Sequence, residues 1–408
     1  MLAGVSTSGG VRRTRTNLRL LAYLARKSLF SSRITVVLLV LALAAGAGFQ
    51  IANTANMTAF RASLLDENLT RGAGDVRVEP RDEARFRDGE AIAAQIRGLS
   101  GIRDAQPLLV FAGAVGKNGK RFYGAPIYGV SPMQFPPYSV LEGAPLAAGD
   151  REGILLGTQY KKRLEVGVGD KVELRVIFGA AGAAIDDDNT GRYTMTVRGI
   201  VAGSAGAYRF AYVDRSFLGA ELGDPKSASA ILVHLHDHEA AGSAAIAITA
   251  SVPTAEAVGW RDDDPYLVSY LGANDTVTTV SYTMVIAAVS VPMWALLYIH
   301  VLRRRREIGV LVAMGFSTSE VFAIYLLQAF VVALVGCVIG AALGLALILY
   351  FQSNPLFEWE TMVVRPLVAA GVFVIPSVVI TATALVAGTY PAWRAARTDP
   401  AAVLRSLE

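Results

Sequence analysis

Four stretches of this chain consist of apolar and small residues and contain no charged side chain. A helix needs about 20 mostly apolar residues to cross a bilayer, and each stretch meets that length. The pattern predicts transmembrane helices at residues 34–53, 276–301, 321–351 and 367–390. The composition agrees, because 53% of the residues are hydrophobic and 18% are charged.

The first apolar stretch also has features of a cleaved signal peptide. Basic residues precede it, and small residues occur near Ala45 and Ala47. Its basic leader, residues 1–33, and the apolar run itself are both long for a signal peptide. We therefore favour an uncleaved first helix, preceded by a helix lying on the membrane surface, and keep the signal peptide as the alternative.

The basic residues are distributed unevenly between the predicted loops. Residues 1–33 contain seven Lys or Arg and no acid, and arginines also occur in residues 302–320 and 391–408. The loop at 352–366 has one arginine, close to Glu358 and Glu360. Because basic loops stay in the cytoplasm, we predict that both termini and the 302–320 segment are cytoplasmic and that residues 54–275 lie outside.

The long segment 54–275 has the pattern of a mixed α+β domain. Its start keeps helical spacing and predicts a stalk, and its end, residues 256–275, is expected to return to the membrane. Between them, short alternating runs such as "DVRVEP" and "KVELRVIF" are separated by Gly, Pro, Asp and Asn, which is typical of strands and turns. The fold class is thus a membrane protein with four transmembrane helices and a large α+β extracytoplasmic domain between helices 1 and 2. The chain's single cysteine, Cys337, falls in the third span, so this domain is expected to fold without disulfides.

Most candidate chemistry in the sequence is weak. His234, His236 and His238 could share a strand face and bind a metal, but a strand that ends where a helix begins explains them equally well. The "GKNGKR" run at 116–121 has the wrong spacing for a phosphate loop and instead indicates a hairpin at Asn118–Gly119. We therefore expect no metal, no cofactor and no enzymatic activity in this chain.

Two features of the membrane part are stronger candidates for function. Gly336, Gly340 and Gly344 recur every four residues in the third span, a spacing that lets another helix pack closely, although glycine is also common in membrane helices without such a contact. In the 302–320 segment, apolar positions fall on one face of a short helix, and Ser317 with Glu320 forms a capping-box pattern for the next span. The helix could rest on lipid, but one fixed at both ends is better suited to receive a push from a cytoplasmic partner.

The sequence of this segment, "RRRREIGVLVAMGFSTSEVFAIYLLQA", resembles the coupling segment of the FtsX/MacB-type (mechanotransmission) ABC permeases. The ending "YPAWRAARTDPAAVLRSLE" is similar to the C-terminal signature of that family. Within residues 54–275, "REGILLGTQYKKRLEVGVGDKVEL" resembles the lipoprotein-releasing Lol permeases, which carry a MacB-like periplasmic core.

The resemblance implies a permease of the bacterial inner membrane that pairs with a second copy or a relative and with a separate ABC subunit holding ATP and magnesium. The residues expected at the ATPase are Arg306, Glu307, Ile308, Gly309, Leu311, Val312, Met314 and Gly315. The function implied is extraction of lipoproteins or similar amphiphilic cargo from the outer leaflet. Export of peptides or small amphiphiles through an adaptor, and a scaffold that activates a cell-wall hydrolase, remain alternatives.

In Lol permeases a periplasmic chaperone docks on a hairpin, which the resemblance places here between Phe178 and Tyr193. Its candidate contact residues are Phe178, Asp186, Asp187, Asp188 and Tyr193. This segment is small and acidic and lacks a large apolar tip, which is a departure from the family pattern.

Overall fold

The computed structural model describes residues 33–117, 119, 121–131, 136–178, 189–203, 207–303, 307–308, 314, 316–359 and 361–396. The described chain forms two compact units. Unit 1 contains the chain up to Thr58, Asp275–Asn354 and the chain from Pro366 onward. Unit 2 contains Ala59–Asn274 and Pro355–Arg365.

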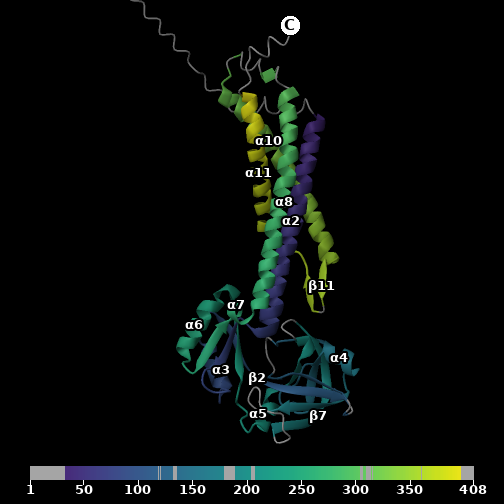
Figure 1. The fold of residues 1–408 in the computed structure, drawn as a ribbon, viewed down its shortest axis with the longest axis vertical. Helices are drawn as coiled ribbons and strands as arrows, with labels where there is room; N and C mark the ends of the chain where they lie inside the picture. The colour runs from purple at the N-terminus through teal and green to yellow at the C-terminus, as the bar shows by residue number, and fades with distance from the viewer. Residues whose placement is uncertain are drawn as a thin grey trace, which may run out of the picture. The chain divides into compact units, whose positions relative to one another are not determined.

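Four helices are long and apolar enough to cross a membrane (Figure 1). They are α2 (Arg33–Leu65), α8 (Pro265–Arg303), α10 (Thr318–Ser353) and α11 (Ala370–Ala396). Helix α2 continues through the predicted stalk into a π-helix, η1 (Asp66–Ala73), and Gly74 ends it with a φ of +78° that suits glycine. Helix α8 begins earlier than the expected start at residue 276, because residues from Pro265 already have helical geometry.

The core of unit 1 consists of small and medium apolar side chains from all four helices. It includes Leu43, Val289, Ala333 and Ile380, all buried. Many large apolar side chains instead lie on the outside, such as Val338, which is 64% exposed. Such a distribution suits helices surrounded by lipid, because hydrocarbon does not penalise exposed apolar groups.

The first part of unit 2 is a four-stranded antiparallel sheet with two helices. Its strands have the order β10-β1-β9-β2. In chain order the elements are β1 (Val76–Pro80), α3 (Gly89–Arg97), β2 (Ile102–Lys117), β9 (Ala230–Leu235), α6 (Ala241–Ser251) and β10 (Ala255–Gly259). This βαββαβ arrangement is ferredoxin-like. Both helices pack their apolar faces on the sheet, for example through Ile96 and Ile248 against Val78 and Val233.

The second part of unit 2 is a closed barrel, inserted in the chain between β2 and β9. Strand β2 pairs with β3, and the ring continues through β8, β5, β7 and β6 back to β2. The new strands are β3 (Arg121–Val130), β4 (Ser139–Gly143), β5 (Gly153–Gly157), β6 (Lys171–Ile177), β7 (Thr190–Ala202) and β8 (Ala211–Asp214), with β4 added on β7. Leu156, Leu174 and Val213 fill the interior and are fully buried. Closure leaves these strands few free edges, and free edges favour aggregation.

Shorter elements complete unit 2. They are α4 (Thr158–Leu164), η3 (Ala207–Arg209), α5 (Arg215–Glu221), η4 (His238–Ala240), α7 (Trp260–Asp263), β11 (Phe357–Trp359) and β12 (Met362–Val364). The β11–β12 hairpin belongs to this unit and packs on it through Phe357, whose ring lies 5.5 Å from that of Phe60. The expected hairpin after β2 is also present. Strands β2 and β3 pair as far as Lys117 and Arg121, with Gly119 between them at a φ of +67°.

Candidate functional site

The segment between α8 and α10 is attached to the ends of the membrane helices by an apolar cluster. Ile308 is completely buried. It packs with Val321 and Tyr325 of α10 and with Ala392 of α11, and Phe316 joins the same cluster. Because one side chain contacts two helices, a displacement of this segment must move α10 and α11 or break the cluster.

The described residues of this segment do not all face the same way. Met314 is 64% exposed and Glu307 is also exposed, whereas Ile308 points into the cluster. The side chain of Ile308 therefore has a packing role and presents no surface to a partner here. The other residues predicted to couple to the ATPase, Arg306, Gly309, Leu311, Val312 and Gly315, lie outside the described part of the chain.

The start of α10 is fixed by a capping box. The backbone N–H of Glu320 donates to Ser317 Oγ at 3.3 Å, and the Ser317 N–H donates to the Glu320 carboxylate at 2.7 Å. This reciprocal pair satisfies two amide groups that a helix end otherwise leaves free. Hydrogen bonds thus hold the first turn of α10 where the 302–320 segment joins it.

The three glycines of α10 lie directly against α2. A Cβ atom on Gly336 would lie 2.6 Å from Leu43 Cβ, and one on Gly340 would lie 2.5 Å from Ala47 Cβ. A Cβ on Gly344 would lie 2.7 Å from Ile51 Cγ2. These distances are too short for any side chain, so glycine is needed for this approach of the two helices.

The root of the predicted partner hairpin is built into the barrel. Phe178 stacks edge-on against Phe111 at 5.3 Å, and Tyr193 packs edge-on on Phe217 at 4.9 Å. The Tyr193 hydroxyl donates to Glu221 at 2.9 Å, and burial together with this carboxylate raises the pKa of Tyr193. Asp186, Asp187 and Asp188 lie outside the described residues. The two aromatic residues named for partner contact therefore anchor the hairpin, whatever its tip binds.

The membrane part of this chain has a recognisable relative. Residues 279–400 match the family described as FtsX-like permease C-terminal. This part of the chain is thus similar to the FtsX-like permeases. The matched residues contain most of α8, the 302–320 segment, α10 and α11, and the match supports an ABC-type permease component. No curated protein matches the chain significantly.

Two solved structures resemble this chain at low identity. One is the extracellular domain of the noncanonic ABC-type transporter YknZ from Gram-positive bacteria, with 13% identity and a TM-score of 0.33, covering 45% of this chain and 99% of that one. The other is the periplasmic region of MacB from Actinobacillus actinomycetemcomitans, with 15% identity and a TM-score of 0.33, covering 52% of this chain and 95% of that one.

Outside the FtsX-like part, the histidines of β9 and η4 form a structural junction. His234 is buried, while the His238 ring contacts the carboxylate of the fully buried Asp75. The other oxygen of Asp75 accepts the Leu235 N–H at 2.8 Å, and Trp260 Nε1 donates to the His238 carbonyl at 2.8 Å. The hydrogen bond to Asp75 raises the pKa of His238, and burial lowers that of His234. The described residues contain no group of three or more side chains placed to hold a metal ion.

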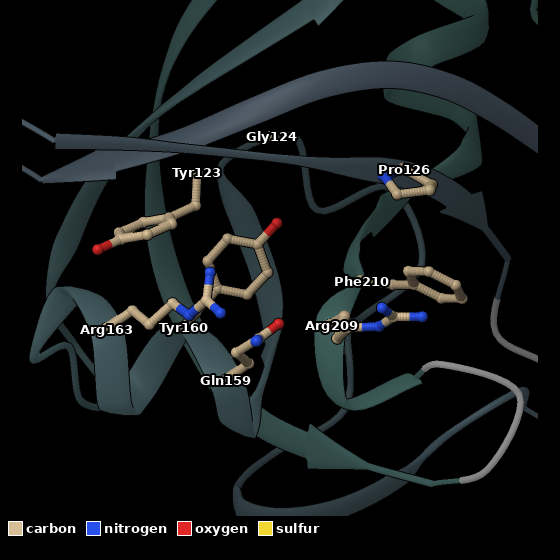
Figure 2. Close-up of a pocket in the computed structure, with 8 residues that line it drawn as sticks. All are labelled: Tyr123, Gly124, Pro126, Gln159, Tyr160, Arg163, Arg209 and Phe210. Carbon is tan, nitrogen blue, oxygen red and sulfur yellow. The ribbon is translucent and has the colours of Figure 1, made fainter.

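Sequence reasoning did not find a hollow on the barrel that two arginines line. Its volume is about 400 Å³, and Figure 2 shows β3 above it, α4 on one side and the η3 turn on the other. Arg163 and Arg209 face it together with Tyr160 and Phe210. These residues come from separated parts of the chain and match no motif, so only the fold brings them together.

Proposed function

We propose that this chain is the membrane subunit of an ATP-driven ABC complex of the mechanotransmission type. It extracts lipoproteins or similar amphiphilic cargo from the outer leaflet of the bacterial inner membrane. A separate subunit binds and hydrolyses ATP, and a second permease, either a copy or a relative, completes the membrane part. Both termini are cytoplasmic, and the β-rich unit lies on the opposite side, where a chaperone or adaptor receives the cargo.

The observation that carries this proposal is the burial of Ile308 at the junction of two membrane helices. A movement imposed on exposed residues such as Met314 reaches α10 and α11 through the cluster around Ile308. The capping box at the start of α10 keeps the first turn of the helix from unwinding, so the motion is passed to the rest of the helix.

The motion continues from α10 to α2 through the glycine contacts. Because Gly340 is in contact with Ala47 and the backbone of α2, the two helices cannot slide past each other without separating. Helix α2 leads directly into η1 along the chain. A rigid path therefore connects the 302–320 segment to the helix that enters the β-rich unit.

The apolar stretches also favour an external source of energy. None of the four contains a charged residue, whereas proton- or sodium-driven transporters place ionisable groups inside the membrane. This pattern disfavours a proton- or sodium-driven transporter and favours a partner that supplies the energy from outside the bilayer.

The cargo is tested by purifying the full chain with its ATPase and identifying the molecules that accompany it by mass spectrometry. A triacylated lipoprotein, released on addition of ATP, is the expected result. An adaptor without any lipoprotein would replace this function with export of peptides or small amphiphiles, and a cell-wall hydrolase would replace it with scaffolding.

The transmission path is tested by a matched pair of substitutions. Met314→Asp changes an exposed side chain and should weaken association with the ATPase. Ile308→Ala leaves the exposed surface in place but opens a cavity in the cluster. We expect it to keep the association and to lower the cargo released per ATP hydrolysed. Normal release by Ile308→Ala would show that force does not pass through this cluster.

A further inference from the structure

The hollow on the barrel lies where two parallel strands separate. Strands β3 and β8 pair in parallel from Ile127 and Ala211 onward. Before that point β3 pairs only with β2 among the described strands, and the chain leading into β8 turns away as η3. Helix α4 closes the third side of this fork (Figure 2). The fork thus has a free strand edge as one of its walls.

Two cations point into the fork, and no carboxylate among the described residues pairs with either of them. The Arg163 guanidinium lies 5.3 Å from the centre of the Tyr123 ring, and that of Arg209 lies 5.3 Å from the ring of Tyr208. Within the described chain neither forms an ion pair. The adjacent Lys161 differs in this respect, because it pairs with Glu142. The positive charge of the fork is therefore available to a ligand, and guanidinium groups bind carboxylates with strong, directional hydrogen bonds.

Apart from Gln159, the rest of the lining is apolar or aromatic. The ring of Tyr160, which is 3% exposed, lies between the two arginines in Figure 2, and Pro126 and Phe210 lie beyond it. The volume of about 400 Å³ falls in the range of sites that hold compact ligands. A free inorganic anion would leave this apolar surface wet, so a better ligand has apolar groups beside its negative charge.

We propose that the fork binds an extended peptide segment of a partner protein, with a carboxylate of the segment held by Arg163 and Arg209. In an antiparallel pair, half of the main-chain groups of a strand point away from its partner. On β3 these groups face the fork between Arg121 and Pro126. A peptide added along this edge gains main-chain hydrogen bonds, while its apolar side chains cover Pro126 and Phe210. The assignment does not depend on the transport function proposed above.

The test uses the full chain in detergent micelles and measures the binding of fluorescent peptides by polarisation. The probe is a short peptide that alternates valine with polar residues and carries one central glutamate. We expect saturable binding, at least tenfold weaker for the same peptide with glutamine in place of glutamate. Arg209→Ala and Arg163→Ala should each weaken the glutamate peptide tenfold or more, and Arg163→Lys by less. Arg87→Ala, which changes an exposed arginine of an ion pair in unit 2, is the matched control.

The strand edge is tested with peptides methylated on alternate backbone nitrogens. Only one edge of the peptide can face β3, so methylation of one alternate set should abolish binding and methylation of the other should leave it unchanged. Equal binding of the glutamate and glutamine peptides would overturn the proposal. Equal effects of the two methylated sets, or competition by inorganic phosphate as strong as by the peptide, would overturn it as well, since the site would then bind free anions.

Discussion

The two units of this protein bury their side chains by opposite rules. In the barrel, large apolar residues such as Leu156 and Leu174 are fully inside. In the helix unit, three glycines of α10 form the contact with α2, and large residues such as Leu41 and Val338 are more than half exposed. Water drives the first arrangement, whereas lipid gives large side chains no reason to leave the surface and leaves close backbone packing to hold the helices.

Filling the glycine contact should have the largest effect. Gly340→Leu places a side chain where Ala47 Cβ and the Ala44 carbonyl already lie, at 2.5 and 2.9 Å from a Cβ atom. Neither is the flexible end of a long side chain, so we expect a loss of more than about 4 kcal/mol in unfolding free energy. Thermal unfolding in detergent measures this loss of stability. The control is Gly371→Leu, which should be nearly neutral because a Cβ atom at Gly371 meets nothing within 4 Å. Similar stability of the two variants would refute the role of the contact.

Removing a large side chain should have the next largest effect, and only in the barrel. Leu156→Ala should lower the unfolding free energy of unit 2 by about 3 kcal/mol, because it leaves a cavity. Leu334→Ala on α10, where the leucine is 50% exposed, should cost less than about 1 kcal/mol. Amide hydrogen exchange in β5 measures the loss of stability in Leu156→Ala, and exchange in α10 measures the loss in Leu334→Ala. Equal losses of free energy in the two variants would show that the side chains of α10 are packed like those of the barrel, and the contrast between the units would be wrong.

Loss of the helix cap should have a smaller effect, confined to the start of α10. Ser317→Ala removes the oxygen that accepts the Glu320 N–H and should cost about 1 kcal/mol. The measurement is faster hydrogen exchange in the first turn of α10. Thr318→Ala, one residue later on an exposed position, serves as the control. Unchanged exchange in Ser317→Ala would mean that the cluster around Ile308 alone fixes this end.

The smallest effect is a pH dependence expected in unit 2. The Asp75 carboxylate raises the pKa of His238 above the ordinary value of 6.5, so the folded state holds this proton more tightly than the unfolded chain. The resulting stability is fully present below pH 6.5 and is lost as the pH rises through the folded-state value. His234 acts in the opposite sense, because burial lowers its pKa and its contribution is lost as the pH falls below 6.5.

The two histidines are separated by comparing variants. His238→Gln should be less stable than the parent protein at pH 6 and nearly equal to it at high pH, in denaturant unfolding of unit 2. His236→Gln, at an exposed position of the same stretch, is the control for the change from histidine to glutamine. A constant difference between His238→Gln and the parent protein would show that the ring acts only through packing.

The long helices of this protein can be predicted from the sequence because each coincides with a local pattern of residues. Long uncharged runs indicate α2, α8, α10 and α11, and the Ser317–Glu320 pattern corresponds to the capping box in the structure. Alternating strands such as β1 and β6 were also indicated. Residues 256–259 were read as part of the return to the membrane, yet they belong to β10, whose short sequence, AEAVG, has little strand character.

The features that the sequence did not reveal depend on contacts between distant residues. Strand β5 has the sequence GILLG and is buried at every position, so it lacks the alternation that identifies a half-exposed strand. Closure of the barrel requires β6 to pair with both β2 and β7, and no local pattern encodes that choice. The fork with Arg163 and Arg209 is a product of this closure, since each arginine looks like an ordinary surface cation in the sequence.

The insertion of the barrel into the ferredoxin-like sheet has a consequence for the order of folding. Strand β9 lies between β1 and β2 in that sheet but is synthesised after every barrel strand. Until it emerges, β1 has neither of its two neighbours, β9 and β10, whereas β2 can already pair with β3 and β6. We therefore expect the barrel to form first during synthesis. By bringing the ends of a long loop together, it then lowers the entropic cost of seating β9.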